Sequence, residues 1–84
     1  MLKIKDNVDL KELKKYGFEE AKPMDYKYPY FLKINSNEYI LVQNRELYYY
    51  VEDELYGYAD PKVFDVIYDL TGNGLLEEVD DKYE

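Results

Sequence analysis

The side chains that most often carry catalysis are nearly missing from this sequence. There is no His and no Cys, and Ser, Thr and Arg occur once each, as Ser36, Thr71 and Arg45. A Cys nucleophile, a His general base and a disulfide are therefore excluded, as are the commonest ligands for zinc, haem and iron–sulfur clusters. Adjacent acids such as Glu77 and Glu78 are common on solvated surfaces, and an acid–base pair needs a deep cleft to separate two pKa values. We expect a protein that is not an enzyme and has no cofactor.

Residues 69–80 are the best match to a metal site. Read as a twelve-residue calcium loop, this segment resembles the loops of EF-hands and dockerins, because Ca²⁺ prefers hard oxygen ligands and the sixth position needs a sharp turn at Gly. The candidate ligands are Asp69, Thr71, Asn73, Glu77 and Asp80. Only three of them are carboxylates, and no second loop pairs with this one. The alternative is a helix that ends at Gly72 or Gly74 and is followed by a strand, without a metal.

Tyrosine gives the strongest signal for binding. The chain has 12 Tyr, and most of them lie between residues 26 and 58. Interfaces favour Tyr because it combines a large apolar area with a polar tip. We therefore expect an acidic, Tyr-rich recognition surface with Glu38 and Glu46 on its rim. The candidate contacts are Tyr48, Tyr50, Glu52, Asp53, Glu54, Tyr56 and Tyr58. The alternative is that these Tyr residues are ordinary half-buried strand residues.

The charge is strongly negative and unevenly divided. The formal net charge is −8, with +2 in residues 1–33 and −10 in residues 34–84. Such a field repels phosphate backbones and attracts a basic protein surface, so we expect no direct nucleic-acid binding. The alternative is that the acids only keep a Tyr-rich domain soluble. No stretch has the length and apolarity of a signal peptide or membrane span, which predicts a cytoplasmic protein without membrane contact.

A short helix over residues 10–16 has a signal at each end. Asp9 is a good N-cap, and Glu12 lies three residues further on, as in a capping box. Gly17 fits the left-handed position after the helix, where Phe18 can contact Leu13 as in a Schellman motif.

The rest of the chain predicts a sheet and one longer helix. Alternating apolar residues indicate a strand at 30–34, and the apolar and aromatic runs at 39–43 and 47–51 indicate two more. Turns at 35–37 and 44–46 join the three as an antiparallel meander. Asp60 and Pro61 begin a helix that ends near Thr71 with Gly72 after it, and its inner face carries Val63, Phe64, Val66, Ile67 and Leu70. Residues 75–79 form a last strand. We expect one α+β domain over residues 1–84, with the amphipathic helix packed on the sheet.

The run at 4–18, Ile-Lys-Asp-Asn-Val-Asp-Leu-Lys-Glu-Leu-Lys-Lys-Tyr-Gly-Phe, resembles the opening of small uncharacterised phage and prophage proteins of Firmicutes. Residues 62–79, with their Gly-Leu-Leu-Glu-Glu-Val ending, are similar to the close of the same proteins. The resemblance implies a phage accessory protein in the cytoplasm of a bacterial host. Small acidic domains of that kind include inhibitors of host defence, among them anti-CRISPR proteins that occupy the nucleic-acid site of a nuclease. The leading hypothesis is a non-catalytic inhibitor that mimics nucleic acid on a basic host protein, and the alternatives are a homo-oligomeric structural protein and a calcium-binding domain.

Overall fold

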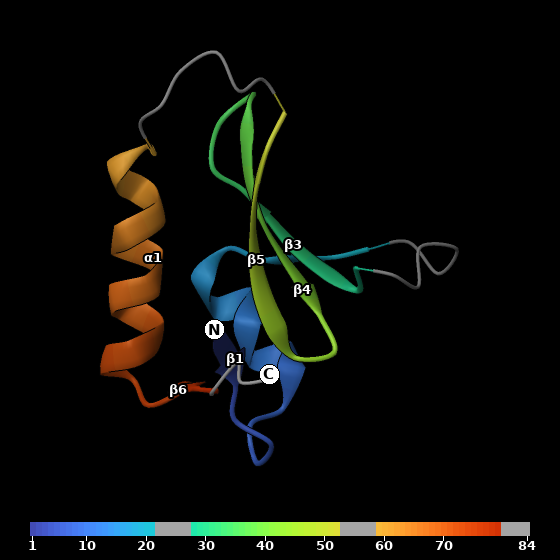
Figure 1. Cartoon of the computed structure of the whole chain (residues 1–84). Coiled ribbons are helices and arrows are strands. Elements are labelled where there is room, and N and C mark those ends of the chain that lie inside the picture. Colours follow the sequence, from blue (N-terminus) through green and yellow to red (C-terminus); the bar gives the residue numbers. More distant parts are fainter. Residues whose placement is uncertain (22–27, 53–58, 80–84) are drawn as a thin grey trace, which may run out of the picture.

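The computed structural model describes residues 1–21, 28–52 and 59–79, and these form a small α+β fold (Figure 1). In chain order the elements are β1 (Leu2–Ile4), the 3-10 helix η1 (Leu10–Tyr16), β2 (Glu19–Glu20), β3 (Tyr30–Lys33), β4 (Glu38–Gln43), β5 (Glu46–Val51), α1 (Pro61–Gly72) and β6 (Leu76–Glu78). The six strands make one antiparallel sheet in the order β2-β3-β4-β5-β1-β6. This confirms the fold class, the meander β3-β4-β5 and the strand near the end of the chain.

The turns of the meander fix its register. Between β3 and β4, the Asn35 side-chain oxygen accepts hydrogen bonds from the backbone N–H groups of Asn37 (2.8 Å) and Glu38 (2.9 Å). Between β4 and β5, Asn44 and Arg45 both have positive φ, 52° and 68°, which is the conformation of the tight two-residue turn that suits the twist of a hairpin. The resulting register places Leu32 opposite Ile40 and Val42 opposite Leu47.

The short helix η1 has both predicted end signals. The Asp9 carboxylate accepts a hydrogen bond from the Lys11 N–H at 3.0 Å, which confirms Asp9 as the N-cap. Gly17 is left-handed with a φ of 96°, and the Phe18 N–H donates to the Leu13 carbonyl at 3.3 Å. That bond is the outer bond of a Schellman motif. Because Leu13 and Phe18 are both buried, the motif also fastens η1 to the core.

Helix α1 begins as predicted, but the left-handed glycine that follows it is Gly74 and not Gly72, two residues later than predicted. Asp60 is the N-cap and Pro61 is the first helical residue. Gly72 lies within the helix, and Gly74 takes the left-handed position with a φ of 76°. A Schellman motif places an apolar pair on either side of its last turn. With Gly74 that pair is Leu70 and Leu75, which are both buried, and the Leu75 N–H donates to the Leu70 carbonyl at 2.9 Å.

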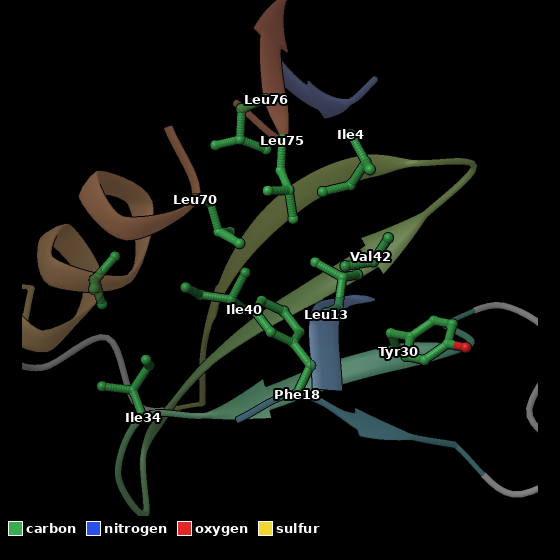
Figure 2. Packing of buried hydrophobic residues seen from close by; sticks show 11 residues of the cluster. Ile4, Leu13, Phe18, Tyr30, Ile34, Ile40, Val42, Leu70, Leu75 and Leu76 are labelled. Atoms are coloured by element: carbon green, nitrogen blue, oxygen red, sulfur yellow. The ribbon is translucent and has the colours of Figure 1, made fainter. Parts of the chain in front are cut away.

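The core lies between the two helices and one face of the sheet (Figure 2). Leu13 from η1 and Leu70 from α1 belong to the same buried cluster as Ile40 and Val42 from β4. Phe64 was predicted on the inner face of α1 but is 60% exposed. Val63, Val66, Ile67 and Leu70 follow the i, i+3, i+4, i+7 spacing of one helix face, and Phe64 lies one residue outside that spacing.

Strands β1 and β2 were not predicted, because each has only two or three residues and contains charged side chains. Among the described residues, no helix is long and apolar enough to cross a membrane.

Candidate functional site

The pairing of the meander strands separates their side chains into two faces. Residues that lie directly opposite each other in an antiparallel pair share a face. Ile40 and Val42 lie on the face that both described helices cover. The other face is left uncovered by these helices, and we call it the open face. Its meander residues are Phe31, Lys33, Tyr39, Leu41, Gln43, Glu46, Tyr48 and Tyr50, and Glu52 follows Tyr50 on the same side.

A groove of about 450 Å³ crosses the open face, and we call it the aromatic groove. Its lining residues are Tyr28, Phe31, Tyr39, Leu41, Tyr50 and Glu52. Tyr39 and Tyr50 are cross-strand partners whose ring centroids lie 6.1 Å apart with planes tilted by 47°. Phe31 and Leu41 are the corresponding pair of β3 and β4. The volume is within the range of small-ligand sites, which are mostly apolar with a few polar groups.

Strand β5 and the residue after it give the open face a row of two phenols with an acid at each end. Glu46, Tyr48, Tyr50 and Glu52 are spaced two residues apart, so their side chains point to the same side. The Tyr48 hydroxyl donates to the Glu46 carboxylate at 2.7 Å. The backbone N–H of Glu52 donates to the Asn37 carbonyl at 2.8 Å, which extends the pairing with β4 to the residue that lines the groove. The structure thus places Tyr48, Tyr50 and Glu52 on the same face, and their contact with a partner stays a prediction.

The remaining predicted contacts lie outside the described residues. These are Asp53, Glu54, Tyr56 and Tyr58.

Glu38 does not rim this surface, so that prediction is wrong. Glu38 is on the helix-covered face and only 7% exposed, because its carboxylate accepts a hydrogen bond from the Asp60 N–H (3.0 Å) at the start of α1. Tyr49 is on the same face as Glu38. Desolvation, followed by the charge of Glu38, raises the pKa of the Tyr49 hydroxyl above its ordinary value of 10.0.

The residues of the predicted calcium loop belong to secondary structure where they are described. Asp69 and Thr71 are within α1, and Asn73 caps the helix by donating its side-chain amide to the Asp69 carbonyl at 2.8 Å. Glu77 is in β6, where its carboxylate lies 3.8 Å from the Lys3 ammonium. Asp80 is outside the described residues. Within residues 1–21, 28–52 and 59–79, no cluster of three acidic side chains could hold a metal ion.

A second exposed apolar region lies between α1 and the sheet. Val63 and Ile67 of α1 face Leu47 and Tyr49 of β5 across a crevice of about 250 Å³. Outside the crevice, Phe64 and Tyr68 of α1 are one helical turn apart and are 60% and 78% exposed. The described residues that line this crevice include no carboxylate.

Four groove residues were not singled out from the sequence: Tyr28, Phe31, Tyr39 and Leu41. The sequence pattern and the register together could have identified three of them, Phe31, Tyr39 and Leu41. Ile40, Leu41 and Val42 are apolar in succession, so β4 needs an apolar environment on both faces. The register that the two short turns impose then places Phe31 and Tyr39 on the side of Leu41.

Comparisons with protein-family models, curated proteins and solved structures found no match to this chain.

Proposed function

We propose that this chain is a non-catalytic binding domain whose open face docks on a partner protein with a basic surface. The observation that carries this proposal is the aromatic groove on the sheet face that the described helices leave uncovered, with Glu52 in its wall. Tyr50 in that groove is 47% exposed. Exposed aromatic rings in a concave, partly apolar site are typical anchors of a protein interface.

The charge favours a basic partner. The chain carries a net charge of −8, and β5 places Glu46 and Glu52 at the two ends of its row on the open face. A basic surface would be steered toward this face, whereas a nucleic acid or an anionic membrane would be repelled.

The resemblance to phage and prophage proteins supports a more specific proposal. In that setting the partner is a bacterial host protein, and the chain acts in the host cytoplasm. A defence nuclease fits the chemistry, because its nucleic-acid groove is basic and an acidic protein can occupy it in competition with the nucleic acid. The chain would then be an inhibitor of the anti-CRISPR type.

A pair of matched variants tests the open face. The first variant combines Tyr50→Ala with Glu52→Lys in the open face. The control combines Tyr68→Ala with Asp65→Lys, which removes an exposed ring and reverses an exposed acid on α1. Each protein is used as bait in a lysate of the bacterial host, and the captured protein is identified by mass spectrometry. That protein is then purified and titrated by calorimetry at low and at high salt.

We expect the open-face variant to lose at least about 10-fold in affinity, as for an interface anchor, and the control to bind within about 2-fold of the original chain. Affinity should also fall as salt rises. Binding that survives the open-face change, or that only the α1 control loses, contradicts the proposal. Capture of no protein by the original chain also contradicts it.

A further inference from the structure

The aromatic groove combines phenol rings with a carboxylate, and both kinds of group attract a cation. Phenol rings present a negative π face, and Glu52 adds a carboxylate to the wall. We propose that the groove binds the guanidinium group of an arginine side chain. This inference rests on the proposed function, because it names the side chain that the basic partner inserts into the open face.

The Tyr39–Tyr50 pair supplies the aromatic part of this site. Their centroids are 6.1 Å apart and their planes are tilted by 47°. A cation is attracted to a ring face within roughly 6 Å of the centroid. A guanidinium that lies over this ring pair can therefore be within that distance of both centroids, while the methylene part of its side chain packs on Leu41 in the same groove.

Glu52 supplies the charged part. Its backbone is fixed by the hydrogen bond to the Asn37 carbonyl, and it follows Tyr50 by two residues on the same side of the sheet. Carboxylates bind guanidinium groups through two parallel hydrogen bonds, and the planar guanidinium also stacks on aromatic faces. A lysine ammonium offers neither the planar fork nor the stacking, so the combination of rings and carboxylate favours arginine.

Lys33 is the neighbouring charge that opposes this binding. It is the cross-strand partner of Tyr39 on the open face and is exposed, although it does not line the groove. Replacing Lys33 by Gln removes a like charge from the neighbourhood of the site. Arginine should then bind more tightly, by about 2-fold for an exposed and screened charge.

Peptide titrations followed by NMR test the ligand chemistry directly. The probe is acetyl-Gly-Arg-Gly-amide, and the matched control replaces Arg by citrulline, which has nearly the same shape and no charge. We expect saturable shifts at the backbone amides of Tyr39, Leu41, Tyr50 and Glu52 with the arginine peptide. The citrulline peptide should give none, and a lysine peptide should bind more weakly than the arginine peptide.

Variants of the full chain separate the ring from the carboxylate. Tyr50→Leu keeps an apolar side chain and should weaken arginine binding roughly 3- to 5-fold, whereas Tyr50→Phe keeps the π face and should retain it. Glu52→Gln should weaken binding roughly 2- to 5-fold and reduce its dependence on salt. Tyr68→Leu on α1 is the control and should change nothing. The amide spectrum of each variant reports whether the fold is retained.

Three results would overturn the inference: equal binding of the citrulline peptide, equal binding of the lysine peptide, or arginine-induced shifts outside the groove. If the arginine peptide fails to bind while a captured partner still depends on Tyr50 and Glu52, the arginine assignment is wrong and the proposed function stands. If the peptide binds the groove and no captured protein depends on those residues, the proposed function is wrong and the groove remains an arginine site.

Discussion

Three polar side chains fasten the start of α1 to the β3–β4 turn. The buried Glu38 carboxylate accepts the Asp60 N–H at 3.0 Å, and the Asn35 side-chain amide donates to the Asp60 carboxylate at 3.1 Å. Asn35 in turn accepts two backbone N–H groups of its own turn. A buried carboxylate is costly unless it is hydrogen-bonded. The position of Glu38 therefore depends on the helix being docked, and the helix is held in place by the same contacts.

The pH dependence of stability should reveal the role of Asp60. The Lys62 backbone N–H, followed by the Asn35 amide, holds the pKa of the Asp60 carboxyl below its ordinary value of 3.8. A carboxyl group whose pKa is lowered in the folded state stabilises the fold at every pH above the pKa that the group has in the unfolded chain. This contribution is lost as the pH falls through the folded pKa.

Asp60→Asn keeps a capping residue but has no carboxylate. We expect the original chain to melt at a higher temperature than this variant at neutral pH, and the difference to shrink steadily below about pH 4. The difference in melting temperature is measured by circular dichroism between about pH 2 and about pH 7. Asp65→Asn, at an exposed position of the same helix, controls for net charge. A difference that is constant with pH would show that the charge of Asp60 contributes nothing to the cap.

Arg45 is the only arginine of the chain, and its contacts are structural. Its guanidinium donates to the carbonyls of Ile4 (3.3 Å), Lys5 (2.7 Å) and Val8. These bonds hold the segment after β1 against the β4–β5 turn. Arg45 also adopts a φ of 68°, which a non-glycine residue takes only at some cost.

Two substitutions at Arg45 separate its hydrogen bonds from its backbone strain. Arg45→Met loses the bonds and keeps the strain, so we expect a loss of about 2 kcal/mol or more in the free energy of unfolding. Arg45→Gly loses the same bonds but suits a positive φ, so it should be less destabilising by about 1 kcal/mol. Urea denaturation gives both values. If Arg45→Gly is as stable as the original chain, the guanidinium bonds contribute no more to the free energy of unfolding than the strain costs.

At the scale of elements, both helices end in the same way. In each, a left-handed glycine follows the helix, and an apolar residue just beyond it contacts the last turn: Leu13 with Phe18 in η1, Leu70 with Leu75 in α1. These four side chains are part of the core. The two helix ends therefore determine where the chain enters β2 and β6 as well as where each helix stops.

A series of three glycine-to-alanine substitutions tests this. Gly17→Ala and Gly74→Ala force a side chain into a left-handed conformation, which should cost about 1 to 2 kcal/mol of stability. Gly17→Ala should cost slightly more, because its Cβ would lie 3.3 Å from a Leu32 methyl, whereas no atom lies within 4 Å at Gly74. Gly72→Ala is the control. It lies inside α1 with nothing within 4 Å, and it should be neutral or stabilising by up to about 1 kcal/mol. Equal losses at all three sites in urea denaturation would contradict the assignment of Gly74 as the helix end.

The elements that could be predicted are those with strong local signals. Asp9 with Gly17, and Asp60 with Pro61, mark helix ends through their own backbone chemistry. Alternation marks β3, and runs of apolar and aromatic residues mark β4 and β5. The end of α1 required a choice between Gly72 and Gly74, and the choice depends on whether Leu70 and Leu75 are buried. Strands β1 and β2 depend on pairing with distant residues, such as Lys3 with Glu46, which no local pattern contains.

Only two of the six groove residues, Tyr50 and Glu52, were singled out from the sequence, for a related reason. The sequence singles out Tyr50 and Glu52 because they lie in a run of Tyr followed by acids. Phe31 and Tyr39 join them only through strand pairing, so they become visible once the register is known. Glu38 was misplaced because it resembles any other acid beside a strand. Its burial depends on the start of α1, 22 residues further along the chain.

At the scale of the whole molecule, the excess negative charge belongs to residues 34–84. Lys14 and Lys15 pair with Glu20 and Glu12 at 3.0 and 2.9 Å, so these lysines and their acid partners all lie within residues 1–33. The net charge of −10 in residues 34–84 belongs to the part of the chain that contains β4, β5, α1 and β6. On the open face of the meander the described acids are Glu46 and Glu52, so a partner meets these two carboxylates on a chain of net charge −8.

The net charge distinguishes the proposed function from its main alternative, a homo-oligomer that uses the open face as its subunit contact. Two copies of a chain with net charge −8 repel each other, so self-association should strengthen as salt screens the repulsion, whereas binding to a basic partner should weaken. We expect light scattering to give a mass of 10.2 kDa at both about 0.1 M and about 1 M salt, between which the Debye length falls from roughly 10 Å to roughly 3 Å. A dimer whose fraction increases with salt, and that is lost in Tyr50→Ala but kept in the Tyr68→Ala control, would assign the open face to a second copy of the chain. A dimer that is lost only in Tyr68→Ala would instead place the subunit contact on α1 and leave the open face available to a basic partner.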